Sequence, residues 1–95
     1  MSTYHLSDAV RRHLDWTSRY AARRRLWPAG TAPAGALTPR DAAHLIRTID
    51  VVCAEAPAGD LPFERFAVLD ELGASLTDWL RDVSPDRVPA ARAAR

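Results

Sequence analysis

Residues 38–56 read TPRDAAHLIRTIDVVCAEA, and this stretch gives the strongest evidence for a helix in the chain. Thr38 is a good N-cap, Pro39 suits the first helical position, and Asp41 stands where a capping box places its acid. Apolar side chains then recur every three or four residues. They are Ala42, Leu45, Ile46, Ile49, Val52, Cys53 and Ala56. Pro57 and Gly59 end the pattern, so we predict a helix over residues 39–56.

Two further helices flank this one. The first is predicted over about residues 7–25, with Ser7 as its N-cap, Asp8 in its first turn, and a broad apolar arc along one side. The third is predicted over about residues 61–83, with Asp60 as its N-cap. Gly73 lies inside the apolar stripe of the third helix, which indicates either a kink or the close approach of another helix. No segment has the alternation of a strand, so none is predicted.

The connections complete the predicted architecture. Residues 27–37 contain two prolines and two glycines and are predicted to be a linker. Residues 84–95 follow a Ser-Pro stop and are expected to be a frayed tail. The sequence thus predicts a single all-α domain, a small up-down-up bundle of three helices. Its 95 residues contain one cysteine and no disulfide, so oligomerisation is one way to complete the fold.

Composition narrows the class of protein. The chain carries 13 basic and 12 acidic residues, and every basic residue is arginine. The absence of lysine, asparagine and glutamine indicates a GC-rich bacterial genome. Residues 1–30 hold six arginines and two aspartates, so the first helix is basic although the net charge is only +1. With no apolar run of membrane-spanning length and no secretory signal, we expect a cytoplasmic protein that does not enter a membrane.

The chemistry-bearing side chains have no catalytic or metal-binding spacing. The three histidines His5, His13 and His44 do not form a ligand pattern. Cys53 lies on the apolar stripe of its helix, where cysteine usually acts as a small hydrophobic residue, while His44 projects to the other side. We therefore predict no catalytic residue, no metal and no cofactor.

The first helix carries the candidate binding residues, because its apolar arc is broader than a three-helix core needs. Three aromatic residues project near one edge of that arc: Trp16, Tyr20 and Trp27. Aromatic residues of this kind are common interface anchors. Three arginines are expected to steer and register the contact against an acidic patch: Arg12, Arg19 and Arg23. A second candidate surface is formed by His44, Arg47, Val51 and Glu55. We predict a non-catalytic helical interaction protein, either a homo-oligomer or an accessory subunit of a larger enzyme complex.

Two alternative functions remain open. A small nucleic-acid-binding regulator would use the arginines of the first helix, although Asp8 and Asp15 interrupt that basic face. A small all-helical enzyme would use an anion pocket between helices. Arg24 and Arg65 fall on apolar stripes and are the candidates for such a pocket, unless both reach out to water from helix ends.

Overall fold

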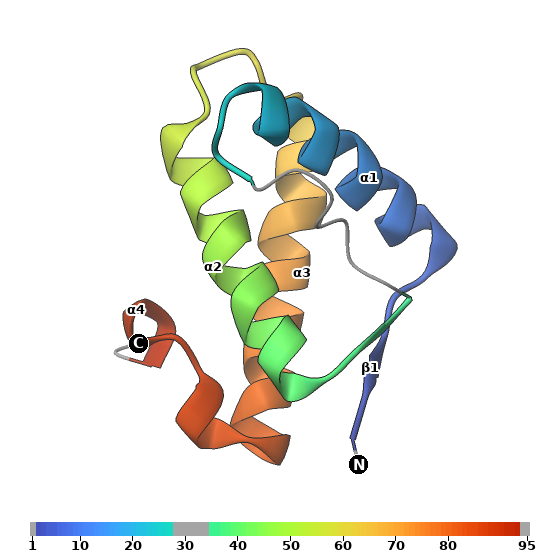
Figure 1. Ribbon diagram of the computed structural model, residues 1–95, viewed down its shortest axis with the longest axis vertical. Coiled ribbons are helices and arrows are strands. Elements are labelled where there is room, and N and C mark those ends of the chain that lie inside the picture. The colour runs from blue at the N-terminus through green and yellow to red at the C-terminus, as the bar shows by residue number, and fades with distance from the viewer. Residues whose placement is uncertain (1, 28–34, 94–95) are drawn as a thin grey trace.

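A computed structural model describes residues 2–27 and 35–93 of the chain (Figure 1). Its helices are α1 (Asp8–Arg23), α2 (Pro39–Glu55), α3 (Phe63–Val83), the 3-10 helix η1 (Pro85–Arg87) and the short α4 (Ala90–Ala93). Two strands, β1 (Tyr4–His5) and β2 (Ala36–Leu37), complete the described elements. The predicted all-helical class is confirmed. No helix of the described residues combines the length and the apolarity that crossing a membrane requires.

Local signals fix the beginnings of two helices. The Ser7 hydroxyl accepts a hydrogen bond from the Val10 amide at 3.2 Å, and the Thr38 hydroxyl accepts one from the Asp41 amide at 3.2 Å. Both predicted N-caps are therefore confirmed, because each satisfies a backbone donor that the helix leaves open. The predicted cap of α3 is wrong. That helix begins after Pro62 without a side-chain cap, since the Asp60 carboxylate is bound elsewhere.

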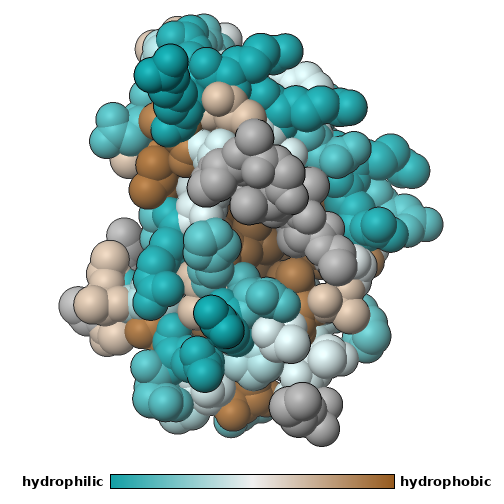
Figure 2. Space-filling model, viewed as in Figure 1, coloured by the Kyte–Doolittle hydropathy of each residue, from teal (hydrophilic) through white to brown (hydrophobic). Residues whose placement is uncertain are grey.

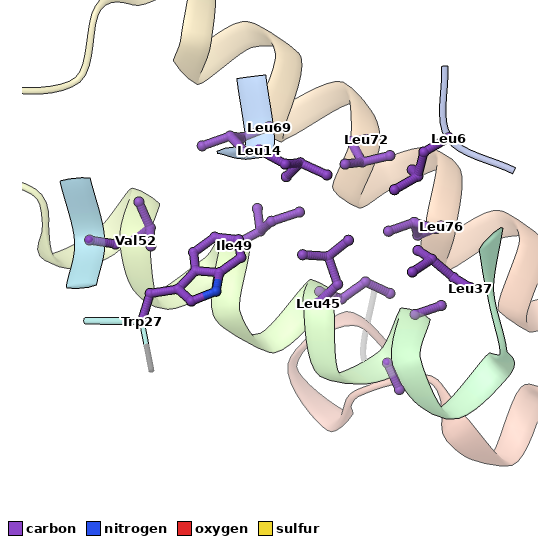
Figure 3. Close-up of a cluster of buried hydrophobic side chains, with 14 of the residues drawn as sticks. Leu6, Leu14, Trp27, Leu37, Leu45, Ile49, Val52, Leu69, Leu72 and Leu76 are labelled. Atoms are coloured by element: carbon purple, nitrogen blue, oxygen red, sulfur yellow. The ribbon is translucent and has the colours of Figure 1, made fainter. Parts of the chain in front are cut away.

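The antiparallel pair α2 and α3 forms the centre of the molecule, and α1 crosses α3 obliquely (Figure 1). Fully buried side chains from all three helices meet between them (Figure 3). Those of α2 are Ile46, Ile49 and Val52, those of α3 are Leu69, Leu76 and Leu80, and those of α1 are Leu14 and Ala21. The apolar stripes read from the sequence thus face one shared core.

A short β-ladder joins the N-terminal segment to the segment before α2, although no strand was predicted. Tyr4 pairs with Leu37 and His5 with Ala36, and the Leu6 amide donates to the Gly35 carbonyl at 2.8 Å. Leu6 and Leu37 are both buried, so the pairing brings two apolar side chains to the core edge. Strands of two residues have no readable period, and this pairing joins segments about 30 positions apart. The prediction that residues 27–37 form a plain linker is therefore wrong at Ala36 and Leu37; residues 28–34 lie outside the described residues.

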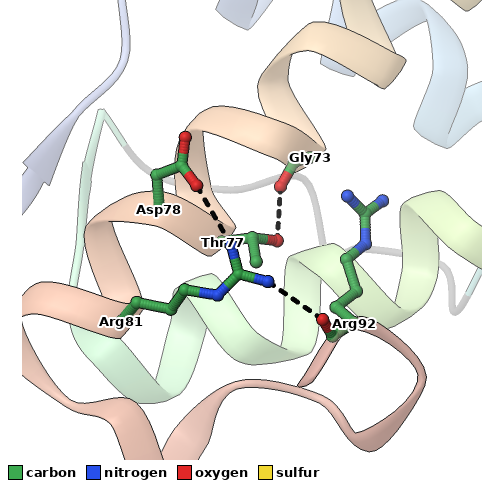
Figure 4. A network of polar contacts seen from close by, with 5 residues as sticks. All are labelled: Gly73, Thr77, Asp78, Arg81 and Arg92. Atoms are coloured by element: carbon green, nitrogen blue, oxygen red, sulfur yellow. Dashed lines mark hydrogen bonds and ion pairs between the residues drawn. The ribbon is translucent and has the colours of Figure 1, made fainter. Parts of the chain in front are cut away.

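The C-terminal segment is ordered and folds back onto the helices, so the predicted frayed tail is wrong for residues 84–93. The Arg92 guanidinium is bound to the Asp50 carboxylate of α2, with nitrogen–oxygen distances of 2.6 and 3.3 Å. Arg81 of α3 donates to the Arg92 carbonyl at 3.0 Å (Figure 4). Charge-assisted hydrogen bonds of this kind hold the last turn in place. Sequence pattern could not show them because each joins distant residues.

The same arginine explains the glycine inside α3. A Cβ atom placed on Gly73 would lie 2.6 Å from the Arg92 Nη2 atom, and its three nearest neighbours all belong to Arg92. Of the two expectations for Gly73, the close approach is confirmed, and the approaching group is a side chain of α4. The backbone here keeps its helical hydrogen bonding, and the Thr77 hydroxyl also donates to the Gly73 carbonyl at 2.7 Å.

Replacing Leu76 by alanine should destabilise the fold strongly, because Leu76 is 0% exposed within the shared core. Loss of a buried leucine side chain costs about 2–5 kcal/mol of unfolding free energy. Phe63→Ala is the matched control, since the Phe63 side chain is 83% exposed and its loss should change stability by less than about 0.5 kcal/mol. Urea denaturation measures both. Equal losses in the two variants would mean that the core lies elsewhere.

Gly73→Ala should have opposite consequences with and without the Arg92 side chain. In an Arg92→Ala background the substitution should stabilise the protein by about 1 kcal/mol through higher helix propensity. In the wild-type background the new methyl group displaces the Arg92 guanidinium, so the gain should shrink or reverse. The unfolding free energies of the four proteins give a double-mutant cycle. A coupling close to zero would contradict the contact between Gly73 and Arg92.

Candidate partner-binding surface

The end of α1 decides which aromatic residues reach the surface. The Arg25 amide bonds to the Ala22 carbonyl and the Leu26 amide to the Ala21 carbonyl, while Arg25 adopts a left-handed φ of 59°. These two bonds and this conformation make a Schellman turn, which stops the helix and reverses the chain. Trp27, two residues later, is therefore carried into the core beside α2, where it lies near Val52 in the close-up (Figure 3).

Two of the three predicted aromatic anchors are buried by the chain itself. Trp27 is 3% exposed and Tyr20 is 8% exposed, so the expectation of an exposed aromatic surface is wrong for both. The sequence placed them at the edge of an arc, but it could not show the turn that encloses Trp27 or the partner of Tyr20. Trp16 remains only partly buried. Its ring is stacked on that of Tyr20, with 5.5 Å between centroids and an interplanar angle of 7°.

Tyr20 is held by a polar contact that crosses between elements. Its hydroxyl donates to the Asp60 carboxylate at 2.9 Å, and Arg24 forms an ion pair with the same carboxylate oxygen. Asp60 therefore ties the end of α1 to the connection between α2 and α3. Burial raises the pKa of the Tyr20 hydroxyl, and the neighbouring Asp60 carboxylate raises it further. Arg24 has its own counter-ion here, which removes it from the predicted anion pocket.

Arg65 of α3 and His13 of α1 meet beside Trp16. The Arg65 guanidinium carbon lies 4.2 Å from the centre of the Trp16 ring, within range of a cation–π interaction. Its Nη1 atom is 3.2 Å from His13 Nδ1. Beside them is a cavity of about 270 Å³, lined by Ala9, Arg12, His13 and Arg65. The sequence singled out Arg65, but its approach to His13 spans 52 positions and left no local signal.

The three predicted steering arginines lie on the outward side of α1, and all are exposed: Arg12, Arg19 and Arg23. At 3.6 residues per turn they fall within about 40° of one another, along a line of about 16 Å. In residues 2–27 and 35–93, no carboxylate lies within 4.0 Å of any of the three. Asp8 instead approaches Arg11, at 4.0 Å. Hydrophilic side chains accordingly cover the molecular surface over α1 (Figure 2).

The second candidate surface also remains exposed. His44, Arg47, Val51 and Glu55 all lie on the outside of α2. Next to His44 and Arg47 is a cavity of about 590 Å³, whose lining includes Arg40 of α2 and Arg87 of η1. Two carboxylates, Asp41 and Asp86, line the same cavity. The contribution of η1 was missed because the sequence assigned residues 84–95 to a frayed tail.

Cys53 has the environment of a structural thiol. It lies on α2, and its side chain is partly buried against the hydrophobic core. Burial raises the pKa of the Cys53 thiol, and the carboxylates of Asp50 and Asp70 raise it further. The nucleophilic thiolate is therefore disfavoured at neutral pH. Within the described residues, no group of three or more histidine, cysteine, aspartate or glutamate side chains is placed to hold a metal ion.

The contact between Tyr20 and Asp60 should make stability depend on alkaline pH. Because the folded-state pKa of Tyr20 is raised above its ordinary value of 10.0, the folded chain keeps a proton that the unfolded chain releases. This contribution is complete below about pH 10 and is lost as the pH rises through the folded-state value. Tyr20→Phe should therefore flatten the decline of unfolding free energy above about pH 10. Chemical denaturation across this pH range measures it. Tyr4→Phe is the control and should keep the decline; a Tyr20→Phe profile identical to wild type would contradict the assignment.

Comparisons with known proteins identify no similar protein. No protein-family model matches the chain, and no curated protein and no solved structure matches it.

Proposed function

We propose that this protein is a non-catalytic helical interaction subunit that docks the outward side of α1 onto an acidic surface of a partner protein. The observation that carries the proposal is the line of Arg12, Arg19 and Arg23. Three guanidinium groups stand exposed along one side of one helix, without a carboxylate partner in the described part of the chain. Arginine is enriched at protein interfaces because its planar donors match carboxylate geometry.

Trp16 supports the same surface with apolar contact. It lies next to the arginine line on α1 and is only partly covered, by Tyr20 and Arg65. A partly exposed tryptophan bordered by arginines provides both an anchor and a charged rim. The burial of Tyr20 and Trp27 narrows the proposed anchor to this one residue. The contact is therefore proposed to depend more on charge than on apolar area.

The distribution of charge favours a protein partner over a nucleic acid. On the outward side of α3 the exposed residues at heptad-like spacing are acidic: Glu64, Glu71, Asp78 and Asp82. Asp8 and Asp15 flank the arginine line on α1 itself, and the net charge of the chain is only +1. A polyphosphate backbone requires an accumulated positive field over a larger face. A bounded acidic patch on a protein needs only the three arginines of the line.

Removing the arginine line should weaken partner binding while the fold is kept. The triple variant Arg12→Ser, Arg19→Ser, Arg23→Ser should bind a co-purified partner at least about tenfold more weakly than wild type, because each arginine is a charged contact. A matched triple variant, Arg40→Ser, Arg47→Ser, Arg87→Ser, removes the same charge from exposed positions outside α1 and should retain binding. Co-expression with the products of neighbouring genes, followed by affinity measurement on the purified complex, supplies the assay.

Two outcomes would overturn the proposal. One is that the partner binds the α1 triple variant as tightly as wild type, or that both triple variants weaken binding equally. The other is saturable binding of DNA or RNA at low salt, with a steep decrease as salt is added, which is lost in the α1 variant. That second result would select the nucleic-acid-binding alternative. Circular dichroism of each variant verifies that helix content is unchanged.

A further inference from the structure

The cavity beside Trp16 has no acidic side chain in its lining. The cavity has a volume of about 270 Å³ and is lined by Ala9, Arg12, His13 and Arg65. Two of these four side chains are guanidinium groups, one is an imidazole, and none is a carboxylate. The lining therefore offers hydrogen-bond donors and positive charge around a space large enough for one small oxyanion. Helix α1 supplies three of the lining residues and α3 supplies Arg65, so the cavity lies where the two helices meet.

Arg65 is held in position on two sides. Its guanidinium lies 4.2 Å from the centre of the Trp16 ring, and its Nη1 atom donates toward His13 Nδ1 at 3.2 Å. Arginine can only donate, so the His13 Nδ1 atom is the acceptor in this contact. One of the five donors of the guanidinium is thus used by His13, and others remain for a ligand. A donor that is already oriented loses less conformational freedom when a ligand binds.

Arg65 also differs from two other arginines that pack against the fold. Arg24 is paired with Asp60 and Arg92 with Asp50, whereas no carboxylate of the described residues lies within 4.0 Å of Arg65. A partly buried cation is costly unless an opposite charge or hydrogen bonds compensate it. The stacking on Trp16 and the bond to His13 compensate in part. An oxyanion in the cavity would provide the charge that the chain does not.

The larger cavity between α2 and η1 is a weaker candidate for the same ligand. It holds three arginines, Arg40, Arg47 and Arg87, but Asp41 and Asp86 lie in its wall. All five of these residues are exposed, so none is fixed by packing as Arg65 is. A carboxylate in the lining repels an oxyanion and offers the arginines an alternative partner. The cavity at Arg65 has neither disadvantage.

We propose that Arg12, His13 and Arg65 form a binding site for a phosphate or carboxylate group of a small molecule. Arg65 donates two hydrogen bonds to the oxyanion from a fixed position, and Arg12 closes the site from the solvent side. Ala9 leaves the space that a larger side chain would fill. This site shares only Arg12 with the arginine line, because Arg19 and Arg23 are not part of its lining. A free anion can occupy it without a partner protein.

Titration of the purified protein with inorganic phosphate tests the site. Resolved proton–carbon NMR signals of the His13 imidazole and the Trp16 indole should shift in a saturable manner. Arg65→Gln should weaken phosphate binding by about tenfold or more, because it removes charged hydrogen bonds. Arg12→Gln should also weaken it, and this exposed position does not endanger the fold. Arg19→Gln is the matched control: it removes the same charge from the same helix outside the cavity and should bind like wild type.

The control separates a built site from general attraction. Equal weakening in Arg19→Gln and Arg65→Gln, or shifts that grow linearly without saturation, would overturn the proposal. Sodium acetate titrated in parallel distinguishes the sources of the oxyanion: tighter binding of phosphate identifies a phosphate compound, and tighter binding of acetate identifies a carboxylate compound. Because these titrations contain no partner protein, their failure leaves the arginine-line proposal intact, and the reverse also holds.

Discussion

The packing of α2 against α3 is the constraint on which the other contacts depend. Ile46, Ile49 and Val52 bury their side chains completely against Leu69, Leu76 and Leu80, and no polar side-chain atom buried in the described residues lacks a partner. Burial of such side chains is the main favourable term in folding. The other described elements pack around this pair: α1 crosses α3, the β-ladder closes one edge, and η1 and α4 return against both α2 and α3.

The parts of the fold that sequence could predict are those determined within a few residues. The caps Ser7 and Thr38 and the apolar periods of the three helices depend on neighbours in the chain, and they were predicted correctly. The parts that were missed depend on pairs distant in sequence. The ladder joins Tyr4 to Leu37, and the tail is fixed by Arg92 and Asp50, which are 42 positions apart. Neither pairing produces a periodic pattern that a reader of one sequence can detect.

The candidate surface also combines features that local sequence determines with features that it does not. The sequence singled out Arg12, Arg19 and Arg23 as steering residues, and all three are exposed in the structure. The burial of Trp27 depended instead on the Schellman turn, in which Arg25 takes a left-handed conformation that usually selects glycine. A non-glycine residue there gave no signal in the sequence. As a result, the exposed apolar area of α1 was overestimated, and its charged area became the stronger basis for a functional proposal.

Trp16 connects the two sites proposed on α1, and the physics of the two sites differs. The arginine line is exposed, so its attraction to an acidic partner is screened within about 8 Å at physiological salt. Arg65 is partly buried between Trp16 and His13, and there the dielectric is lower and salt screens less. A partner on the line therefore forms a contact that responds to ionic strength, whereas an oxyanion in the cavity is held by oriented donors. Since Arg12 belongs to both sets, occupation of the cavity neutralises part of the line, so the two ligands would weaken each other where they meet.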